Sequence, residues 1–264
     1  MCLILVAWQA HPDFPFVLAA NRDEFFARRS ASADFWKDQP KILAGRDLEA
    51  GGTWLGMTRG GSDGYKFAAL TNFRDPGSHK PQAPSRGRLV ADFLAGDMTI
   101  DAYLDMLHPA DYNGFNLLLG DGQRLFAFNN VTQERHELAP GIYGLSNHLL
   151  DTPWPKVGAG KTALAAALTA LPDESHLWRL LRDDTVHPDA DLPATGVSID
   201  WERLLSAAFI RSPDYGTRCS TVVKVGAGGT ESPAWGTASF DEQTWLPNGQ
   251  AGARKRFRFR LESR

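Results

Sequence analysis

The order of apolar and amphipathic segments is the feature that most constrains the fold of this chain. The patterns predict strands at residues 2–8, 16–20, 41–44, 53–57 and 67–73, followed by helices at 87–94 and 100–107. Further strands are predicted at 115–119, 124–129 and 141–145. Helices follow at 161–171, 177–181 and 201–209, and a last set of strands at 217–225, 234–239 and 255–261. Because each type comes in runs rather than alternating, we expect an α+β fold with antiparallel sheets and helices segregated to the outside.

A single domain over residues 1–264 is the simplest organisation. A chain of this length buries about three quarters of its extended-chain surface, so one core suffices without disulfides. Residues 187–196 are rich in Pro and Asp, which predicts an exposed loop, and residues 226–233 are predicted to form a second loop.

Charge and cysteine usage exclude several classes of protein. The 28 Lys plus Arg against 31 Asp plus Glu, a net charge of -3, give no electrostatic case for nucleic-acid binding. Two cysteines are too few for a disulfide framework. The apolar run at residues 2–8 lacks preceding basic residues and is too short to span a bilayer, so we expect neither a signal peptide nor an integral anchor. The expected location is the cytoplasm.

The first two strands predict a hairpin that brings the start of the chain to a polar segment. In an antiparallel pair the residue numbers of partners have a constant sum. If Trp8 lies near Pro15, that sum is about 23 and Cys2 lies opposite Asn21. The register can slip by a residue or two, because the sequence does not fix the loop type. The thiol is therefore expected beside Asn21, Arg22 and Asp23.

These residue types suit nucleophilic chemistry. Removal of Met1, favoured by the small residue after it, would leave Cys2 with a free α-amine to serve as base for its own thiol. Arg22 would lower the thiol pKa, Asp23 could orient the amine, and the Asn21 amide could donate to an oxyanion. The alternative is a small buried cysteine followed by a turn with a surface ion pair.

Several motifs, in the right order over most of the chain, carry a resemblance to a known family. The first is Asn-Arg-Asp-Glu at residues 21–24, behind Met1-Cys2. The others are GGTWLG at 51–56, TNFRD at 71–75, YGLSN at 143–147, LDTPWPK at 150–156 and GTRCST at 216–221. The chain resembles the NRDE family, also called the transport-and-Golgi-organisation-two family, which is similar to the N-terminal-nucleophile hydrolases. The resemblance implies a four-layer αββα sandwich of two antiparallel sheets between helices.

Cysteine members of the hydrolase class cleave linear amides. Carried over, Cys2 would be nucleophile and base, Asp23 would hold the α-amine, Arg22 would support the thiolate and Asn147 could donate to the oxyanion. The corresponding motif of those cysteine hydrolases is Arg-Asn-x-Asp. In this chain Arg22 and Asp23 are adjacent instead, and they project to opposite faces of the strand.

Members of the NRDE family are instead linked to moving haem, with lipid or acyl-CoA handling also proposed. The resemblance thus implies a protein that binds and transfers haem or another lipophilic molecule, and the alternative is an amidohydrolase with a Cys2 nucleophile. Haem would be cargo, and no resident cofactor is required. Cys2 or His148 could ligate its iron, and Arg22 or Arg74 could pair with propionates. For His148, a hydrogen-bonded loop histidine is the alternative.

Two further patterns bear on ligands. The seven histidines show no metal-binding spacing, so no metal site is expected. The basic tail at residues 254–260 alternates strictly, which predicts a strand with Phe257, Phe259 and Leu261 inward and solvated arginines. Transient contact with anionic lipid is the alternative for this tail.

Overall fold

The computed structural model describes residues 2–60, 64–227 and 236–261, which form two antiparallel sheets. The first sheet has the order β10 (Gly141–Leu145), β1 (Cys2–Trp8), β2 (Phe16–Phe25), β11 (Tyr215–Val225), β12 (Thr237–Leu246) and β13 (Gln250–Arg260). The second has the order β3 (Ser30–Phe35), β4 (Ile42–Asp47), β5 (Leu55–Thr58), β6 (Phe67–Asn72), β7 (Phe115–Gly120), β8 (Leu125–Asn129) and β9 (Arg135–Glu137).

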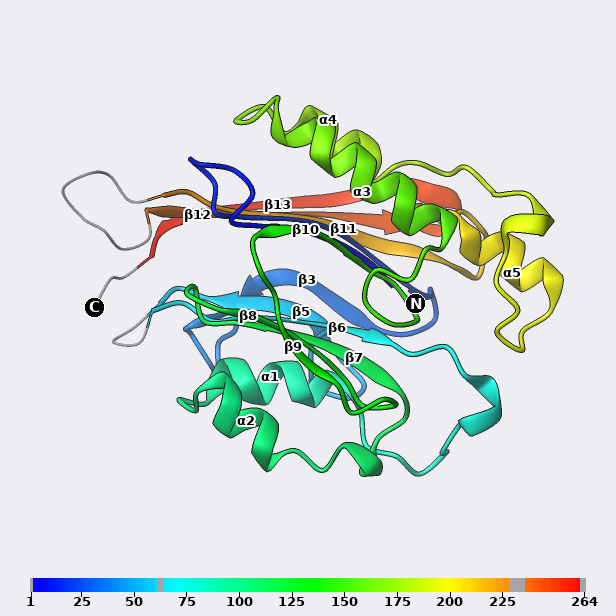
Figure 1. The fold of residues 1–264 in the computed structure, drawn as a ribbon, viewed down its shortest axis with the longest axis horizontal. Helices are drawn as coiled ribbons and strands as arrows, with labels where there is room; N and C mark the ends of the chain where they lie inside the picture. The colour runs from blue at the N-terminus through cyan, green and yellow to red at the C-terminus, as the bar shows by residue number, and fades with distance from the viewer. Residues whose placement is uncertain (1, 61–63, 228–235, 262–264) are drawn as a thin grey trace.

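Helices cover the outer faces of both sheets. Figure 1 shows α3 (Pro155–Leu168) and α4 (Ser175–Leu180) over the first sheet, and α1 (Gly87–Ala95) and α2 (Ile100–Met106) over the second. A further helix, α5 (Ile199–Ser206), lies beside the end of the first sheet (Figure 1). The expected α+β sandwich of two antiparallel sheets between helices is confirmed.

Strand β1 shows why the apolar pattern is continuous rather than alternating. Ile4, Val6 and Trp8 pack into the core between the two sheets, whereas Leu3 and Leu5 pack against α3 and α4. Successive side chains in a strand point to opposite faces, and here both faces are buried. Every residue of the strand is therefore apolar or small.

The predicted elements differ from the observed ones at several boundaries. The predicted helix at 161–171 begins earlier, at Pro155, and β12 runs on to Leu246, well past the expected end at 239. Strands β3 and β9 were not predicted, because their residues are mostly polar or exposed. Most of the predicted loop at 226–233 and the first two residues of the strand predicted at 234–239 lie outside the described residues.

The basic tail forms β13, at the edge of the first sheet. Phe257 and Phe259 pack against the core between the sheets, and Leu261, just past the strand, is buried there. Among the arginines of the opposite face, Arg258 pairs with the buried Asp241 while remaining half exposed. The inward phenylalanines predicted from the alternation are confirmed.

Candidate functional site

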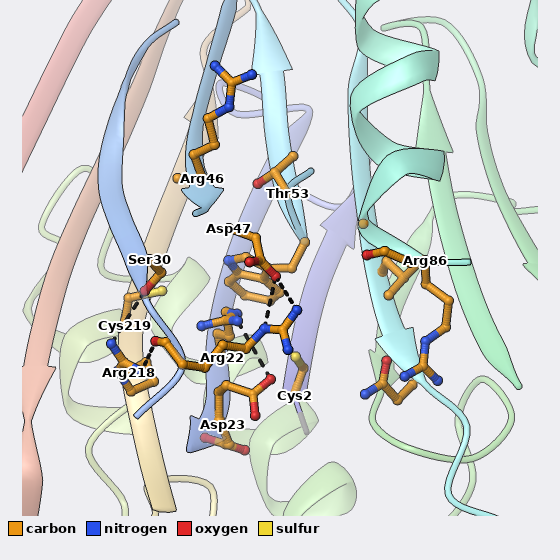
Figure 2. A pocket seen from close by; sticks show the side chains of 18 of the residues that line it. Cys2, Arg22, Asp23, Ser30, Arg46, Asp47, Thr53, Arg86, Arg218 and Cys219 are labelled. Atoms are coloured by element: carbon orange, nitrogen blue, oxygen red, sulfur yellow. Dashed lines mark hydrogen bonds and ion pairs between the residues drawn. The ribbon is translucent and has the colours of Figure 1, made fainter. Parts of the chain in front are cut away.

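A cavity of about 510 Å³ lies between the two sheets, and Cys2 is part of its wall. The first sheet contributes Arg22 from β2 and Arg218 from β11, among others. The second sheet contributes Ser30 from β3, and the segment before α1 adds further polar residues. Figure 2 shows these side chains around the same space, although they come from distant parts of the sequence.

The hairpin register differs by one residue from the expected one. Trp8 pairs with Phe16 and Cys2 with Arg22, so the prediction that Cys2 lies opposite Asn21 is wrong. Pro15 has no backbone N–H to give to the ladder, and it remains in the loop, where its carbonyl accepts from Gln9 at 2.7 Å. Direct partners share a face of the sheet, so Cys2 and Arg22 both face the space between the sheets.

Asn21 and Asp23 project to the other face of β2, towards the helical layer. The Asn21 amide donates to the carbonyls of Leu181 at 2.8 Å and Ala208 at 2.7 Å, and its oxygen accepts from Ser220. These bonds occupy both amide hydrogens, so the structure does not present Asn21 to the cavity as an oxyanion donor. Asn21 acts instead as a buried tie between β2 and the chain around α4 and α5.

Asp23 lies at the boundary between the cavity and the helical layer. It is among the residues of the cavity wall, and its buried carboxylate accepts a hydrogen bond from Thr217 Oγ1 at 2.7 Å. Burial raises the pKa of this carboxyl, against the opposing charge of Lys156. The structure thus brings Asp23 close to Cys2, as the sequence predicted (Figure 2).

The electrostatic state of the thiol differs from expectation. Burial raises the pKa of Cys2, although the positive charge of Arg22 acts in the opposite direction. Arg22 thus acts in the expected direction, but removal of the thiolate from water has the larger effect, so the net shift of the Cys2 pKa is upward. Burial therefore favours the protonated thiol over the thiolate.

Arg74 lies away from the cavity, in a buried ion pair. Its Nη1 donates to Glu202 at 2.7 Å, both side chains are only 4% exposed, and the guanidinium stacks over Trp154. Lys156 lies in the same region and donates to the Leu205 carbonyl at 2.8 Å; burial lowers its pKa to about 8. The structure does not bring Arg74 to the cavity as a propionate partner.

His148 and Asn147 also lie outside the cavity wall. The His148 ring contacts Phe73 and Trp154, and its Nδ1 lies 3.0 Å from Thr152 Oγ1, so it is the hydrogen-bonded loop histidine of the alternative interpretation. The Asn147 amide donates to the carbonyl of Asn72 at 2.9 Å. Because Asn72 is part of the wall, Asn147 supports the cavity from behind.

Sequence reasoning missed several residues of the cavity wall. Cys219 pairs with Arg22 on the side away from Cys2, so the three residues form a row across β1, β2 and β11. Glu242 accepts from the Ala33 amide at 2.6 Å and thereby ties β12 to β3 beside the cavity. The motif at 216–221 pointed to Cys219, but no sequence signal pointed to Glu242.

Gly52, in the motif at 51–56, packs against Gly87, which is part of the cavity wall. A Cβ on Gly52 would lie 2.4 Å from the carbonyl carbon of Gly87, at the first turn of α1. The Thr53 amide donates to that carbonyl at 3.0 Å. The close approach requires glycine at position 52, and it fixes the start of α1 and the neighbouring Arg86 against the cavity.

Within the ranges that the structure describes, no helix is long and apolar enough to cross a bilayer. In the same ranges, no three or more His, Cys, Asp or Glu side chains gather in a way that could hold a metal ion.

Comparison with known proteins gives a consistent result. Residues 1–234 match the model of the family described as Transport and Golgi organisation 2. The chain is 39% identical to the Transport and Golgi organization protein 2 homolog of Bos taurus, with 87% of this chain and 90% of that protein covered. It is 38% identical to the homolog of Homo sapiens, with the same coverage, and 32% identical to Transport and Golgi organization protein 2 of Drosophila melanogaster, with 85% and 88% covered. The chain therefore belongs to the Transport and Golgi organisation 2 family.

Proposed function

We propose that this protein binds a small amphipathic molecule, of the kind represented by haem, a lipid or an acyl-CoA, in the cavity beside Cys2 and passes it on to an acceptor. The observation that carries the proposal is the cavity itself: a space of about 510 Å³, between two sheets that are otherwise packed. The names of the related proteins refer to transport, which agrees with a carrier role.

The wall of the cavity offers both kinds of contact that an amphipathic molecule needs. Trp54, Leu70 and Trp245 provide apolar surface, and Arg22 and Arg218 provide charge. Arginine pairs well with carboxylates and phosphates, because its planar group donates two parallel hydrogen bonds. This combination supports an apolar ligand with an acidic group more than a purely apolar one.

If the ligand is haem, the wall offers two residues for the iron. Cys2 was expected in this role, and His79 also lies in the wall whereas His148 does not. Thiolates and neutral imidazoles are both common axial ligands of haem. If haem is the ligand, we therefore propose His79 rather than His148 as the histidine ligand of its iron.

A haem titration tests the proposal directly. We expect the Soret band to shift on addition to the wild-type protein, and the shift to weaken in Cys2→Ser or His79→Ala. His148→Ala is the matched control and should leave the shift unchanged. A wild-type Soret band identical to that of free haem would exclude haem as the cargo. Tryptophan quenching by palmitate and palmitoyl-CoA then decides whether the cavity takes any lipophile.

The second candidate function is amide hydrolysis by Cys2. Its support is the position of the thiol in the cavity wall, beside Arg22 and Asp23. The mechanism requires removal of Met1, because only a free α-amine can take the thiol proton before the sulfur attacks an amide carbonyl. The Asn21 and Asn147 amides bond to carbonyls elsewhere, so a ligand-induced shift or another donor would have to supply the oxyanion contact.

Intact mass separates this candidate from the first. Retention of Met1 in the purified protein would exclude self-activation of Cys2 and leave binding and transfer as the function. Loss of Met1 would be compatible with hydrolysis by Cys2. In that case an amide-type electrophile should modify Cys2 covalently, with Cys2→Ala as the control.

A further inference from the structure

The arginines in the cavity wall fall into two groups with different partners. Arg28 donates twice to Asp47, at 2.9 and 2.7 Å, and Arg46 forms a two-pronged pair with Asp38. These two guanidiniums are compensated by carboxylates of the protein. Both arginines belong to the cavity wall, but these ion pairs already neutralise their charges.

Arg86 and Arg218 form the second group. Arg218 donates to the carbonyls of Phe25 and Arg28, with Ser30 Oγ at 3.4 Å. Arg86 donates to the carbonyl of Gly114 at 2.9 Å. Over residues 2–60, 64–227 and 236–261, no carboxylate lies within ion-pair distance of either guanidinium.

Arg22 lies between these two residues and is only weakly paired. Its contact with Glu24 is 3.7 Å long, beyond hydrogen-bond distance, and its side chain is 12% exposed. Figure 2 shows Arg218 on one side of Cys2 and Arg22, and Arg86 on the other. The guanidiniums of Arg22, Arg86 and Arg218 thus line the cavity wall around Cys2 (Figure 2).

This arrangement of partly buried cations costs free energy unless an anion binds beside them. Burial lowers the pKa of both Arg86 and Arg218, and the charge of Arg22 lowers that of Arg218 further. The carboxylate of Glu24, which is also in the wall, opposes these shifts only in part, because both pKa values remain lowered. The neighbouring thiols do not compensate these charges, because burial raises the pKa of Cys2 and that of Cys219.

We propose that Arg22, Arg86 and Arg218 form an oxyanion subsite that binds the phosphate or carboxylate group of the ligand above Cys2. This inference rests on the proposed function, in that the cavity binds a ligand, and it adds where the acidic group lies and which residues select it. The apolar part of the ligand then extends along Trp54 and Leu70. Arg28 and Arg46 take no part, because Asp47 and Asp38 already hold them.

Isothermal titration with small probes tests the subsite without a lipophilic cargo. Inorganic pyrophosphate represents the phosphate source, octanoate the carboxylate source, and octanamide is the neutral control. We expect at least one of the two anions to bind to the wild-type protein, and octanamide to bind at least tenfold more weakly than octanoate if the carboxylate is the source. Arg86→Gln and Arg218→Gln should each weaken anion binding by about tenfold, the loss of one charge-assisted pair.

Arg46→Gln is the matched control, because Arg46 lies in the same wall but is paired with Asp38. It should change the affinity by less than about twofold, within the scatter of weak polar contributions. Binding of pyrophosphate alone assigns the subsite to phosphate esters, and binding of octanoate alone assigns it to carboxylates. Absence of binding by both anions, or an equal loss in Arg46→Gln, overturns the proposal.

The outcome is separable from that of the proposed function. A wild-type protein that shifts the Soret band or binds palmitoyl-CoA, but binds neither small anion, contradicts only the subsite. A protein that binds the small anions through Arg86 and Arg218, but neither haem nor lipid, contradicts only the transfer of a lipophile.

Discussion

The two faces of strand β2 differ in how their polar groups are satisfied. On the helical face, Asn21 and Asp23 are buried, and both bond to other parts of the protein. On the face between the sheets, Arg22 lies beside Cys2 in the wall of the cavity, with only a long contact to Glu24. Residues consecutive in the sequence therefore perform different tasks: one face holds the helical layer in place, and the other is left open for a ligand.

The difference explains which substitutions should affect stability and which should affect binding. Buried polar groups with protein partners contribute to folding, and removal of one partner leaves the other unsatisfied. Polar groups in a cavity wall contribute less to folding, because they face the cavity rather than a partner in the protein. The comparison can be tested by matched substitutions on the two sides.

The largest effect on stability is expected from Arg74→Met, on the helical side. Glu202 would lose its 2.7 Å pair while remaining almost fully buried, because Thr195 still holds its other oxygen. Loss of one partner of a buried pair costs about 3–5 kcal/mol. Chemical denaturation measures this loss in the free energy of unfolding. In contrast, Arg203→Met, which breaks the half-exposed pair with Asp189, should cost less than about 1 kcal/mol. Equal effects would contradict the comparison.

Asn21→Ala is expected to have the next largest effect, about 3 kcal/mol, since it leaves two buried carbonyls without a donor and removes the acceptor of the Ser220 hydroxyl, which keeps only its bond from Trp245. Arg22→Gln, the neighbouring residue on the cavity face, should change the free energy of unfolding by less than about 1 kcal/mol. The pair is compared by urea denaturation. A larger loss for Arg22→Gln than for Asn21→Ala would show that the cavity face is structural.

Gly52→Ala should destabilise the protein by about 2 kcal/mol, because its Cβ would collide with the Gly87 backbone and displace the start of α1. Gly158→Ala, at an exposed helical position with no atom within 4 Å of the new Cβ, should instead stabilise by about 0.5–1 kcal/mol. Thermal denaturation shows whether each variant is less or more stable than the wild type. If Gly52→Ala is neutral, the cavity wall at α1 is less tightly fixed than the structure indicates.

The pH dependence of Lys156 is a graded effect, about 1 kcal/mol for each pH unit. Burial lowers its pKa from 10.5 to about 8, so between these values the unfolded state binds more protons than the folded state. Stability contributed by this group must therefore rise with pH over that window, and below pH 8 its burial is a constant penalty. The stability of the wild type relative to Lys156→Met should increase by about 1 kcal/mol per pH unit between pH 8 and 10. A constant difference would show that Lys156 is not desolvated.

The sequence predicted much of this structure, because apolar patterns reflect burial directly. The run at residues 2–8 and the alternating tail at 254–260 were assigned correctly to strands, and the order of elements predicted the two antiparallel sheets. Helix α3 was predicted to begin late, because Gly158 and Gly160 lower its helix propensity. The structure shows why glycine is present: a Cβ on Gly160 would lie 2.8 Å from the Leu5 side chain.

The sequence by itself determined that Cys2 and residues 21–24 meet, because a hairpin fixes neighbours to within a residue or two. Only the tertiary structure decided that Cys2 shares a face with Arg22 and not with Asn21, because side chains alternate with a period of two and a slip by one residue exchanges the faces. It also decided that Arg86 and Arg218 face one cavity while Arg74 and His148 do not. Those contacts join residues far apart in the chain, and no local pattern carries information about them.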